Sequence, residues 1–242
     1  MSHPYDRILI IIPTYNESEN ISTLIDEIYH TVRREVDVLV IDDNSPDGTG
    51  KVVSELSRRN PRVALMERKG KEGYARAYLE GFSYALKNHY SVIVCMDADL
   101  SHHPTYLNQF FDLIQENDFV LGSRYIPGGG VENWGWFRRF LSRGGNLYAR
   151  WVLNASICDL TSGYKCFRSQ MLAKIGYQEI KSKGYEFNME LTYLFHRNGF
   201  SIKEVPIIFT DRRYGSSKLS KWMILEALIK VWKLRLGSKR KR

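Results

Sequence analysis

Residues 91–99 read SVIVCMDAD, a continuous apolar run that ends in two aspartates, Asp97 and Asp99. Such a run without alternation is typical of a strand that is buried on both faces of a sheet. Two carboxylates at the end of a buried strand repel one another, and each raises the pKa of the other. A divalent cation removes this conflict, since Mg²⁺ or Mn²⁺ prefers oxygen ligands and bridges to substrate phosphates. The alternative is a pair of solvated loop acids, so the choice depends on what lies beside them.

Apolar runs of the same kind alternate with helical patterns along the first half of the chain. Strands are predicted at 7–13, 36–43, 62–68, 91–99 and 118–125, and helices at 18–34, 48–59, 73–88 and 103–117. This alternation predicts an α/β fold with a mostly parallel sheet.

The pattern changes after Tyr125. The Gly-rich segment 126–136 is interpreted as a flexible loop. It is followed by a basic helix at 137–155, a short GYKCFR segment at 163–168, a helix around 186–197 and a strand at 204–211. The second half is therefore expected to elaborate the same sheet and not to form a separate domain.

The composition narrows the class of protein. A chain of 242 residues with 43% hydrophobic residues can form a large core and is not a disordered polypeptide. Cys95, Cys158 and Cys166 are odd in number and form no CxxC pair, which favours a reducing compartment over a disulfide framework or a zinc site. No signal-peptide pattern and no apolar stretch of about 20 residues occurs, so no membrane-spanning helix is expected.

Positive charge gathers at the C-terminus of a chain whose formal net charge is +8. Residues 219–236, LSKWMILEALIKVWKLRL, predict an amphipathic helix that carries two tryptophans and several basic residues. Such a helix can lie in a membrane interface, or it can pack on the core and lead into a frayed basic end. The basic tail points to polyanions, either nucleic acid or anionic lipid.

Polar motifs follow several of the predicted strands. They are PTYNE at 13–17, DDNSPDG at 42–48, DADLSHH at 97–103 and GSRY at 122–125. In open parallel sheets, ligands bind beyond the carboxyl ends of the strands. Neither GxGxxG nor GxxxxGK[ST] occurs, so a dinucleotide fingerprint and a P-loop are both unsupported. Each motif alone can be a turn or a helix start, but together they indicate a site for a metal and a phosphate group.

The motifs PTYNE, DDNSPDGT, DADLSHHP, GSRY, RRFLSRGGN, DLTSGYKCFR, KGYEFNMEL and DRRYGSSKL occur in this order across residues 8–220. In these motifs the chain resembles the family-2 glycosyltransferases with a GT-A fold. Within that family it is most similar to the polyprenyl-phosphate mannose synthases, such as the catalytic subunit of dolichyl-phosphate mannosyltransferase. The resemblance implies a GT-A catalytic domain over 1–218, with a Rossmann-like, mostly parallel sheet flanked by helices. An amphipathic basic helix and tail would then occupy 219–242.

The resemblance also implies an activity. Mannose would pass from GDP-mannose to dolichyl or another polyprenyl phosphate with inversion, giving dolichyl β-D-mannosyl phosphate and GDP, for use in protein glycosylation and GPI-anchor synthesis. The implied cofactor is Mg²⁺ or Mn²⁺, and the implied partners are the lipid acceptor, a membrane surface and small transmembrane subunits, with no nucleic acid. The expected location is the cytosolic face of the endoplasmic reticulum, or the cytoplasmic membrane in a bacterium.

Donor-side residues are carried over from the resemblance by position. Pro13, Tyr15 and Glu17 would surround the guanine nucleoside, and Ile41 and Asp43 would lie beside the base or ribose. Asp97, Ala98 and Asp99 would hold the metal and the diphosphate. Ser101 stands where relatives carry a further metal ligand, and Arg212 and Lys218 match residues that close over the donor phosphates.

Acceptor-side residues follow in the same way. Arg124, Arg138 and Ser142 match positions that grip the acceptor phosphate, and Asp99, Arg124 and Arg138 are the predicted catalytic residues. Lys165 stands in GYKCFR where many relatives read GFR, and no role is assigned to it.

Three other readings stay open at this point. A UDP-glucose-dependent polyprenyl-phosphate glucosyltransferase would use the same scaffold. A nucleic-acid-binding protein would bind in a salt-dependent way, although acids at successive strand ends argue against it. A non-catalytic nucleotide-binding module would bind nucleotide with a metal and transfer nothing.

Overall fold

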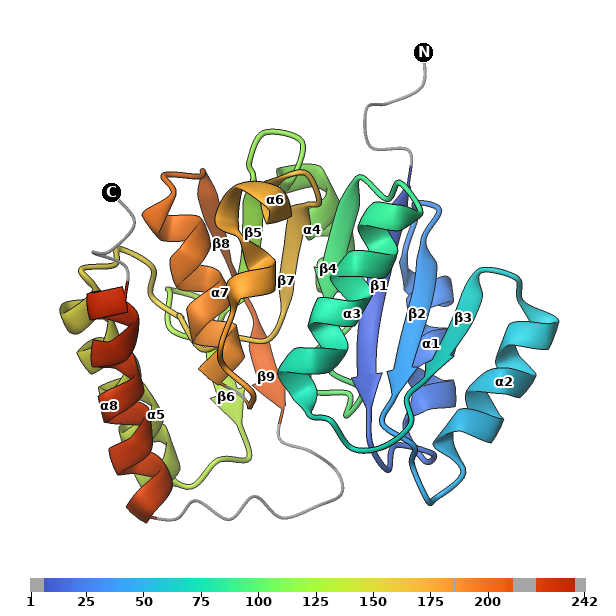
Figure 1. Ribbon diagram of the computed structural model, residues 1–242, viewed down its shortest axis with the longest axis horizontal. Helices are drawn as coiled ribbons and strands as arrows, with labels where there is room; N and C mark the ends of the chain where they lie inside the picture. The colour runs from blue at the N-terminus through green and yellow to red at the C-terminus, as the bar shows by residue number, and fades with distance from the viewer. Residues whose placement is uncertain (1–6, 185, 211–220, 238–242) are drawn as a thin grey trace.

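The computed structural model describes residues 7–184, 186–210 and 221–237, and in the last of these segments it describes side chains from residue 228 onward. A seven-stranded sheet in the order β3-β2-β1-β4-β7-β5-β8 forms the centre of the molecule (Figure 1). Its strands are β1 (Ile8–Thr14), β2 (Asp37–Asp42), β3 (Val63–Glu67), β4 (Val92–Cys95), β5 (Phe119–Ser123), β7 (Lys165–Arg168) and β8 (Ile202–Pro206). All neighbouring strands run parallel except β7, which is antiparallel to both β4 and β5. The predicted α/β fold with a mostly parallel sheet is confirmed.

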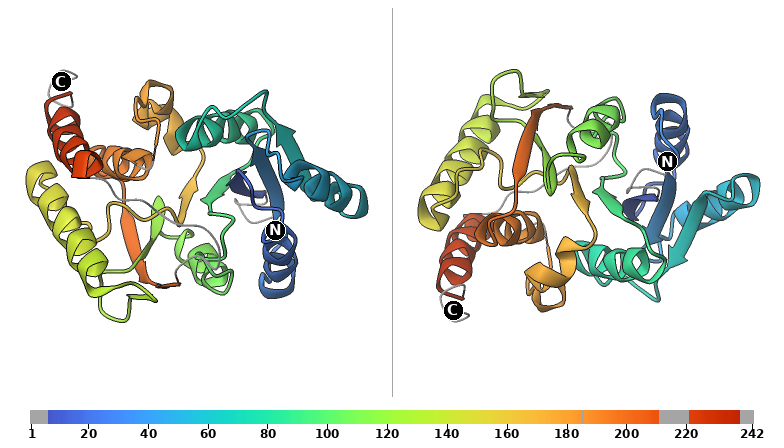
Figure 2. Two further views of the ribbon diagram at one scale, coloured as in Figure 1. Left: turned by 90° about the horizontal axis from the view of Figure 1, so that it is seen from below. Right: turned by 90° about the horizontal axis from the view of Figure 1, so that it is seen from above.

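The sheet is buried on both faces, as the continuous apolar runs predict. Successive side chains of β1 point to opposite faces, so Leu9 and Ile11 join one hydrophobic cluster while Ile10 and Ile12 join the other. Helices α1 (Ile21–Thr31), α2 (Thr49–Arg59) and α4 (Tyr106–Leu113) contribute to the second cluster. Helices α3 (Tyr74–Lys87), α6 (Met171–Ile175) and α7 (Glu186–Arg197) contribute to the first. The result is a three-layer arrangement of helices, sheet and helices (Figure 2).

Strand β4 is shorter than its apolar run, because pairing ends at Cys95 and the two aspartates lie beyond the strand. Leu100 has a φ of 62°, a left-handed conformation that a bulky side chain adopts only at a cost. This turn brings Ser101 and His102 back against the aspartates.

Two sequence expectations are corrected, and the short GYKCFR segment, for which no element type was predicted, contains β7 between β4 and β5. The Gly-rich segment 126–136 contains the short strand β6 (Gly130–Glu132) and is not only a loop. The strand predicted at 204–211 divides in two: β8 joins the main sheet, and β9 (Ile208–Thr210) pairs with β6. Backbone hydrogen bonds at these short strands are fixed by tertiary pairing, which local sequence does not reveal.

Two helices lie side by side at one end of the sheet, α5 (Trp136–Leu153) and α8 (Lys221–Gly237) (Figures 1 and 2). The Tyr148 hydroxyl donates to the Leu228 carbonyl at 3.3 Å, and Arg235 Nη1 donates to the Leu153 carbonyl at 3.2 Å. Val231 is 3% exposed and joins the core. The predicted C-terminal helix is therefore present, and one side of it packs on the domain. Across the described residues, no helix combines the length and apolar character needed to cross a membrane.

Candidate active site

The two aspartates differ in how the turn after β4 holds them. Asp99 is buried, and its Oδ1 accepts hydrogen bonds from the Ser101 hydroxyl at 2.5 Å and the Ser101 backbone N–H at 3.2 Å. The side chain of Asp97 is 23% exposed, and its Oδ1 accepts from the Tyr74 hydroxyl at 2.9 Å. Ser101 therefore orients Asp99 directly, in addition to any contact that its oxygen makes with a metal.

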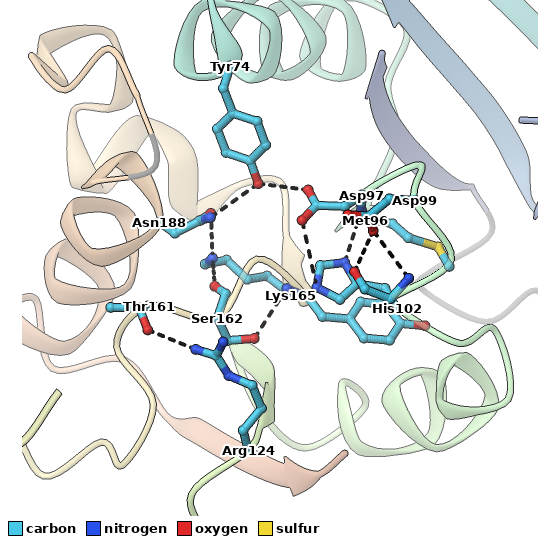
Figure 3. A network of polar contacts seen from close by, with 12 residues as sticks. Tyr74, Met96, Asp97, Asp99, His102, Arg124, Thr161, Ser162, Lys165 and Asn188 are labelled. Atoms are coloured by element: carbon cyan, nitrogen blue, oxygen red, sulfur yellow. Dashed lines mark hydrogen bonds and ion pairs between the residues drawn. The ribbon is translucent and has the colours of Figure 1, made fainter. Parts of the chain in front are cut away.

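His102 supports Asp97 from below (Figure 3). Its Nδ1 accepts the backbone N–H of Asp97 at 3.0 Å, and its ring stacks on Tyr164 with centroids 4.8 Å apart. Burial lowers the pKa of His102, so the ring is neutral near pH 7. Because Nδ1 is an acceptor, the proton lies on Nε2, which faces Asp97 Oδ2 at 3.9 Å.

These residues fit a hard divalent cation. The available donors are carboxylate and hydroxyl oxygens, the ligands that Mg²⁺ and Mn²⁺ prefer. Gly163 leaves room beside them, since a Cβ there would lie 3.2 Å from Asp97 Oδ2 and 3.0 Å from His102 Cε1. Within the described residues no group of three or more His, Cys, Asp or Glu side chains is placed to hold a metal ion by itself. A cation bound by Asp97 and Asp99 would therefore depend on phosphate and water for its remaining ligands.

Predicted donor residues lie at the ends of β1 and β2. Tyr15 is 38% exposed, with Lys71 Nζ 3.7 Å from the centre of its ring. Asp43 is buried, forms an ion pair with Arg68, and accepts the Gly73 N–H at 3.0 Å. Pro13 of β1 lies opposite Ile41 of β2, and Thr14 of β1 lies opposite Asp42 of β2. Glu17 accepts a hydrogen bond from Asn20 at 2.8 Å in the first turn after β1.

Two of the predicted donor residues have side chains in the core. Ile41 is fully buried, and a Cβ on Gly81 of α3 would lie 2.9 Å from it. Ala98 is 3% exposed and belongs to the other hydrophobic cluster. Any contact of Ile41 or Ala98 with a nucleotide is therefore expected through their main-chain atoms.

Arg124 lies just beyond β5 and is fixed by a buried carboxylate. Its Nε and Nη2 donate to the two oxygens of Asp159 at 2.7 and 2.8 Å, and Nη2 also donates to Thr161 Oγ1 at 2.8 Å. Burial would raise the pKa of Asp159, but Arg124 lowers it below its usual value. Burial would likewise lower the pKa of Arg124, and Asp159 raises it. Both groups are charged, and within the described part of the chain Nη1 of Arg124 donates no hydrogen bond.

Arg138 and Ser142 come from α5 and lie close to Arg124. The Ser142 and Tyr125 hydroxyl oxygens are 2.6 Å apart, and the Arg124 guanidinium carbon lies 5.2 Å from the centre of the Tyr125 ring. The Arg138 guanidinium carbon lies 4.0 Å above the ring of Trp134. The structure thus brings the three predicted acceptor residues together, whereas Arg212 and Lys218 lie outside the described residues.

Sequence reasoning missed the groups that hold the site together. Asn146 donates to Asp159 Oδ1 at 3.2 Å, and Lys165 Nζ donates to Asn188 Oδ1 at 2.8 Å. Asp159 stands in the quoted DLTSGYKCFR motif, and a carboxylate in this buried stretch is the signal that could have indicated a partner for Arg124.

The fold is that of the GT-A glycosyltransferases. The structure resembles glucosyl-3-phosphoglycerate synthase from Mycobacterium tuberculosis, solved with Mn²⁺, UDP-glucose and phosphoglyceric acid, with a TM-score of 0.70, 17% identity, and coverage of 96% of this chain and 80% of that one. It also resembles mannosyl-3-phosphoglycerate synthase from Rubrobacter xylanophilus, with a TM-score of 0.70, 16% identity, and coverage of 98% and 75%. At these identities the likeness establishes the fold.

The family follows from the sequence. The family model described as glycosyl transferase family 2 matches residues 9–176, and the chain belongs to that family. It is 46% identical over 236 residues to a polyprenol monophosphomannose synthase of Mycolicibacterium smegmatis, covering 96% of this chain and 89% of the relative. It is 40% identical over 233 residues to an undecaprenyl-phosphate mannosyltransferase of Micrococcus luteus, covering 96% of each. The resemblance drawn from the motifs is confirmed.

Proposed function

We propose that this protein transfers mannose from GDP-mannose to a polyprenyl phosphate, with inversion, to give a polyprenyl β-mannosyl phosphate and GDP. The observation that carries the proposal is that two groups of residues suited to phosphate lie at the same edge of the sheet, beyond the ends of β4 and β5. Asp97 and Asp99 fit a metal-bound diphosphate, and Arg124, Arg138 and Ser142 fit a second phosphate. The two bacterial relatives are named for mannose transfer to lipids of this class.

The chemistry of the acceptor explains why the site holds arginines. A phosphate monoester is ionised at pH 7, so its oxygen attacks the anomeric carbon without a general base. The difficulty is that an anionic nucleophile approaches an anionic donor, and cations are needed on both sides. Arg124, held rigidly by Asp159, presents Nη1 to the acceptor phosphate, and Arg138 adds a second positive charge.

On the donor side, a divalent cation would neutralise the departing diphosphate. Asp97 and Asp99 would bind it, and the Ser101 hydroxyl keeps Asp99 oriented. Pro13, Tyr15, Glu17 and Asp43 would hold the nucleoside, and Arg212 and Lys218 would cover the phosphates, as the resemblance implies.

The exposed face of α5 suits an acceptor that is embedded in a membrane. Four large apolar residues spaced four, seven and four positions apart share one side of the helix. They are strongly exposed: Trp136 at 80%, Phe140 at 72%, Leu147 at 65% and Trp151 at 75%. The same helix supplies Arg138 and Ser142 to the site. If α5 lies on a membrane, a lipid whose phosphate binds beside Arg138 and Ser142 would have its polyprenyl chain in that membrane.

Helix α8 extends this surface. It exposes Ile229, Trp232 and Leu236 at 49%, 46% and 57%, while Val231 faces the core. We therefore place the protein peripherally on the bacterial cytoplasmic membrane, the location that suits its bacterial relatives. The expectations of an endoplasmic-reticulum location, a role in GPI-anchor synthesis and small partner subunits have no support from those relatives, so they are not part of the proposal.

A transfer assay tests the proposal. The purified protein is incubated with radiolabelled GDP-mannose and undecaprenyl or dolichyl phosphate in detergent, with Mn²⁺, with Mg²⁺ or with a chelator, and a parallel series uses UDP-glucose. The expected result is a mannolipid formed only with a divalent cation. Faster transfer of glucose from UDP-glucose would mean that UDP-glucose, and not GDP-mannose, is the donor. Nucleotide binding without transfer to either lipid would indicate a non-catalytic module.

A further inference from the structure

A chain of hydrogen bonds runs from the buried side chain of Lys165 to Asp97 (Figure 3). Lys165 Nζ donates to Asn188 Oδ1 at 2.8 Å, and Asn188 Nδ2 donates to the Tyr74 hydroxyl at 3.1 Å. The Tyr74 hydroxyl then donates to Asp97 Oδ1 at 2.9 Å. The participating residues come from β7, α7, α3 and the end of β4.

The chemistry of each group gives this chain one direction. An ammonium group can only donate, so the Asn188 atom that faces Lys165 must be the amide oxygen. The amide nitrogen therefore faces Tyr74 and donates to its oxygen. A phenol has a single hydrogen, and the charged carboxylate of Asp97 at 2.9 Å is a stronger acceptor than the neighbouring Tyr78 hydroxyl, which itself donates to the Met96 carbonyl. Reversing the Asn188 amide would place two donors, the ammonium group and the amide nitrogen, against one another.

Lys165 is costly to keep where it is. It is fully buried, and in the part of the chain that the structure describes, no carboxylate forms an ion pair with it. Its ammonium instead donates to the Ser162 carbonyl and to Asn188. Burial lowers the pKa of Lys165 to about 8, below its ordinary value of 10.5. A buried cation without an ion-pair partner needs a reason beyond stability, and its hydrogen bonds lead through Asn188 and Tyr74 to Asp97.

Asp97 needs such support. Its other oxygen faces His102 Nε2 at 3.9 Å, too far for a hydrogen bond. The Tyr74 hydroxyl is thus the closest side-chain donor that the described residues give to this carboxylate. Groups that hydrogen-bond to a ligating side chain fix its orientation, and removing them weakens metal binding about 10- to 100-fold.

We infer that Lys165, Asn188 and Tyr74 are positioning residues that act in series to hold Asp97 in the orientation in which it binds the cation. The inference rests on the proposed function, in which Asp97 is a metal ligand. It gives a role to a lysine at a position where the resemblance assigns none.

Binding of Mn²⁺ in the presence of GDP, measured by the electron paramagnetic resonance signal of free Mn²⁺, tests the inference without relying on transfer. Tyr74→Phe removes only the hydroxyl and is expected to raise the Kd for Mn²⁺ by about tenfold. Tyr90→Phe is the matched control, because the Tyr90 hydroxyl donates to Asp37 Oδ2 at 2.8 Å at the opposite end of the sheet. That variant should bind Mn²⁺ within about twofold of the wild type.

A double-mutant cycle tests the connection in series. Lys165→Met should also raise the Kd, and the double variant Lys165→Met with Tyr74→Phe should bind no more weakly than the weaker single variant. Thermal unfolding of each variant shows whether it is folded. If Lys165→Met does not fold, the cycle of Asn188→Leu with Tyr74→Phe gives the same information.

The outcomes separate this inference from the proposed function. Wild-type protein that binds no Mn²⁺ with GDP would overturn both. If the wild type binds Mn²⁺ and Asp97→Ala does not, then an unchanged Kd in Tyr74→Phe would overturn the positioning role alone. Additive effects in the cycle would also overturn it, since independent effects mean that Lys165 does not act through Tyr74.

Discussion

Asp159 and Arg124 form a buried pair in which each charge depends on the other. Arg124 is 9% and Asp159 0% exposed at the side chain, and two hydrogen bonds from the guanidinium and one from the Arg124 backbone N–H join them. Asp159→Asn leaves the guanidinium buried without its counterion, which costs about 3 kcal/mol of folding free energy. It also frees Arg124 from its fixed geometry, so the KM for polyprenyl phosphate should rise more than the KM for the donor.

Urea unfolding and steady-state kinetics measure both effects. The control is Glu55→Gln, which breaks the exposed pair between Glu55 and Arg59 on α2 and should change stability by less than about 1 kcal/mol. Equal stability losses in the two variants would contradict this account of the buried pair.

The lowered pKa of Lys165 predicts that the free energy of unfolding depends on pH in an unusual direction. Its pKa is about 8 in the folded protein and 10.5 ordinarily, so between these values the unfolded chain binds a proton that the folded chain lacks. Stability from this group therefore rises as pH increases through that window, and the penalty of burying the charge is full below pH 8. Lys165→Met removes a penalty on the order of 3 kcal/mol at low pH and nothing at high pH.

The measurement is the difference in Tm between variant and wild type from pH 7 to pH 10.5. This difference should fall steadily as pH rises. Lys203→Met on the exposed edge of β8 is the control and should give a difference that does not vary with pH. The same flat difference for Lys165→Met would mean that Lys165 does not titrate in this window.

At the scale of single residues, the sequence indicates the proposed ligands of metal and phosphate better than the residues that hold those ligands in place. Asp97 and Asp99 are visible because they end an apolar run, and Arg124 because it follows another. Asp159, Asn188 and Tyr74 are invisible in this way, since each reaches the site only through the packing of a distant element. Lys165 was assigned no role from its position in a motif, and only its burial shows that it needs one.

Helix α5 combines residues of the proposed acceptor site with an exposed surface of aromatic and basic residues. Arg139 and Arg143 are exposed one turn apart on this helix. Each basic residue near an anionic membrane contributes about 1 kcal/mol to binding. The double change Arg139→Gln with Arg143→Gln should therefore weaken binding to vesicles of phosphatidylglycerol and phosphatidylcholine by about tenfold or more.

Vesicle co-sedimentation at two salt concentrations measures this effect. Arg58→Gln with Arg59→Gln removes the same charge from exposed positions on α2, away from α5, and is the control. Trp136→Gln with Trp151→Gln should weaken binding to vesicles of phosphatidylcholine alone, where charge plays no part. Equal losses in the α2 control would mean that net charge, and not the face of α5, sets membrane affinity.

At the scale of helices and strands, the sequence predicts those elements correctly that are long and determined by local pattern. The buried runs became β1 to β5, and the amphipathic patterns became helices with the expected faces. Strand β7 has four residues and lies between β4 and β5 because its partners fit it there, which no local pattern encodes. The three-residue strand β6 is likewise defined only by its pairing with β9. The loop predicted at 126–136 is therefore wrong for the three residues of β6, and no element type was predicted for β7.

At the scale of the whole molecule, the proposed function divides the reaction between the two halves of the sheet. The proposed donor residues follow β1, β2 and β4, and the proposed acceptor residues follow β5 and lie on α5. Strand β7 joins the halves, because it pairs with β4 and β5 and carries Lys165 between Asp97 and Arg124 (Figure 3). A substitution should therefore be able to weaken binding of one substrate without weakening binding of the other, whereas transfer should require both halves of the sheet.

Asp99→Ala and Arg138→Ala test this separation. Asp99→Ala should lose Mn²⁺-dependent GDP binding and metal-dependent turnover, because only Asp97 remains to hold the cation, yet it should bind vesicles as the wild type does. Arg138→Ala should keep Mn²⁺ and GDP binding within about twofold, since Arg138 lies on α5, and lose at least about tenfold in transfer rate.

Isothermal titration with GDP and Mn²⁺, vesicle co-sedimentation and transfer assays on the same preparations measure the three quantities. Full turnover in Asp99→Ala would contradict the metal site, and loss of GDP binding in Arg138→Ala would contradict the division between the halves. The proposed division has a physical reason. The donor diphosphate and the acceptor phosphate are both negatively charged and repel one another. A fold that binds each substrate at different strand ends would hold the two apart until cations neutralise their charges.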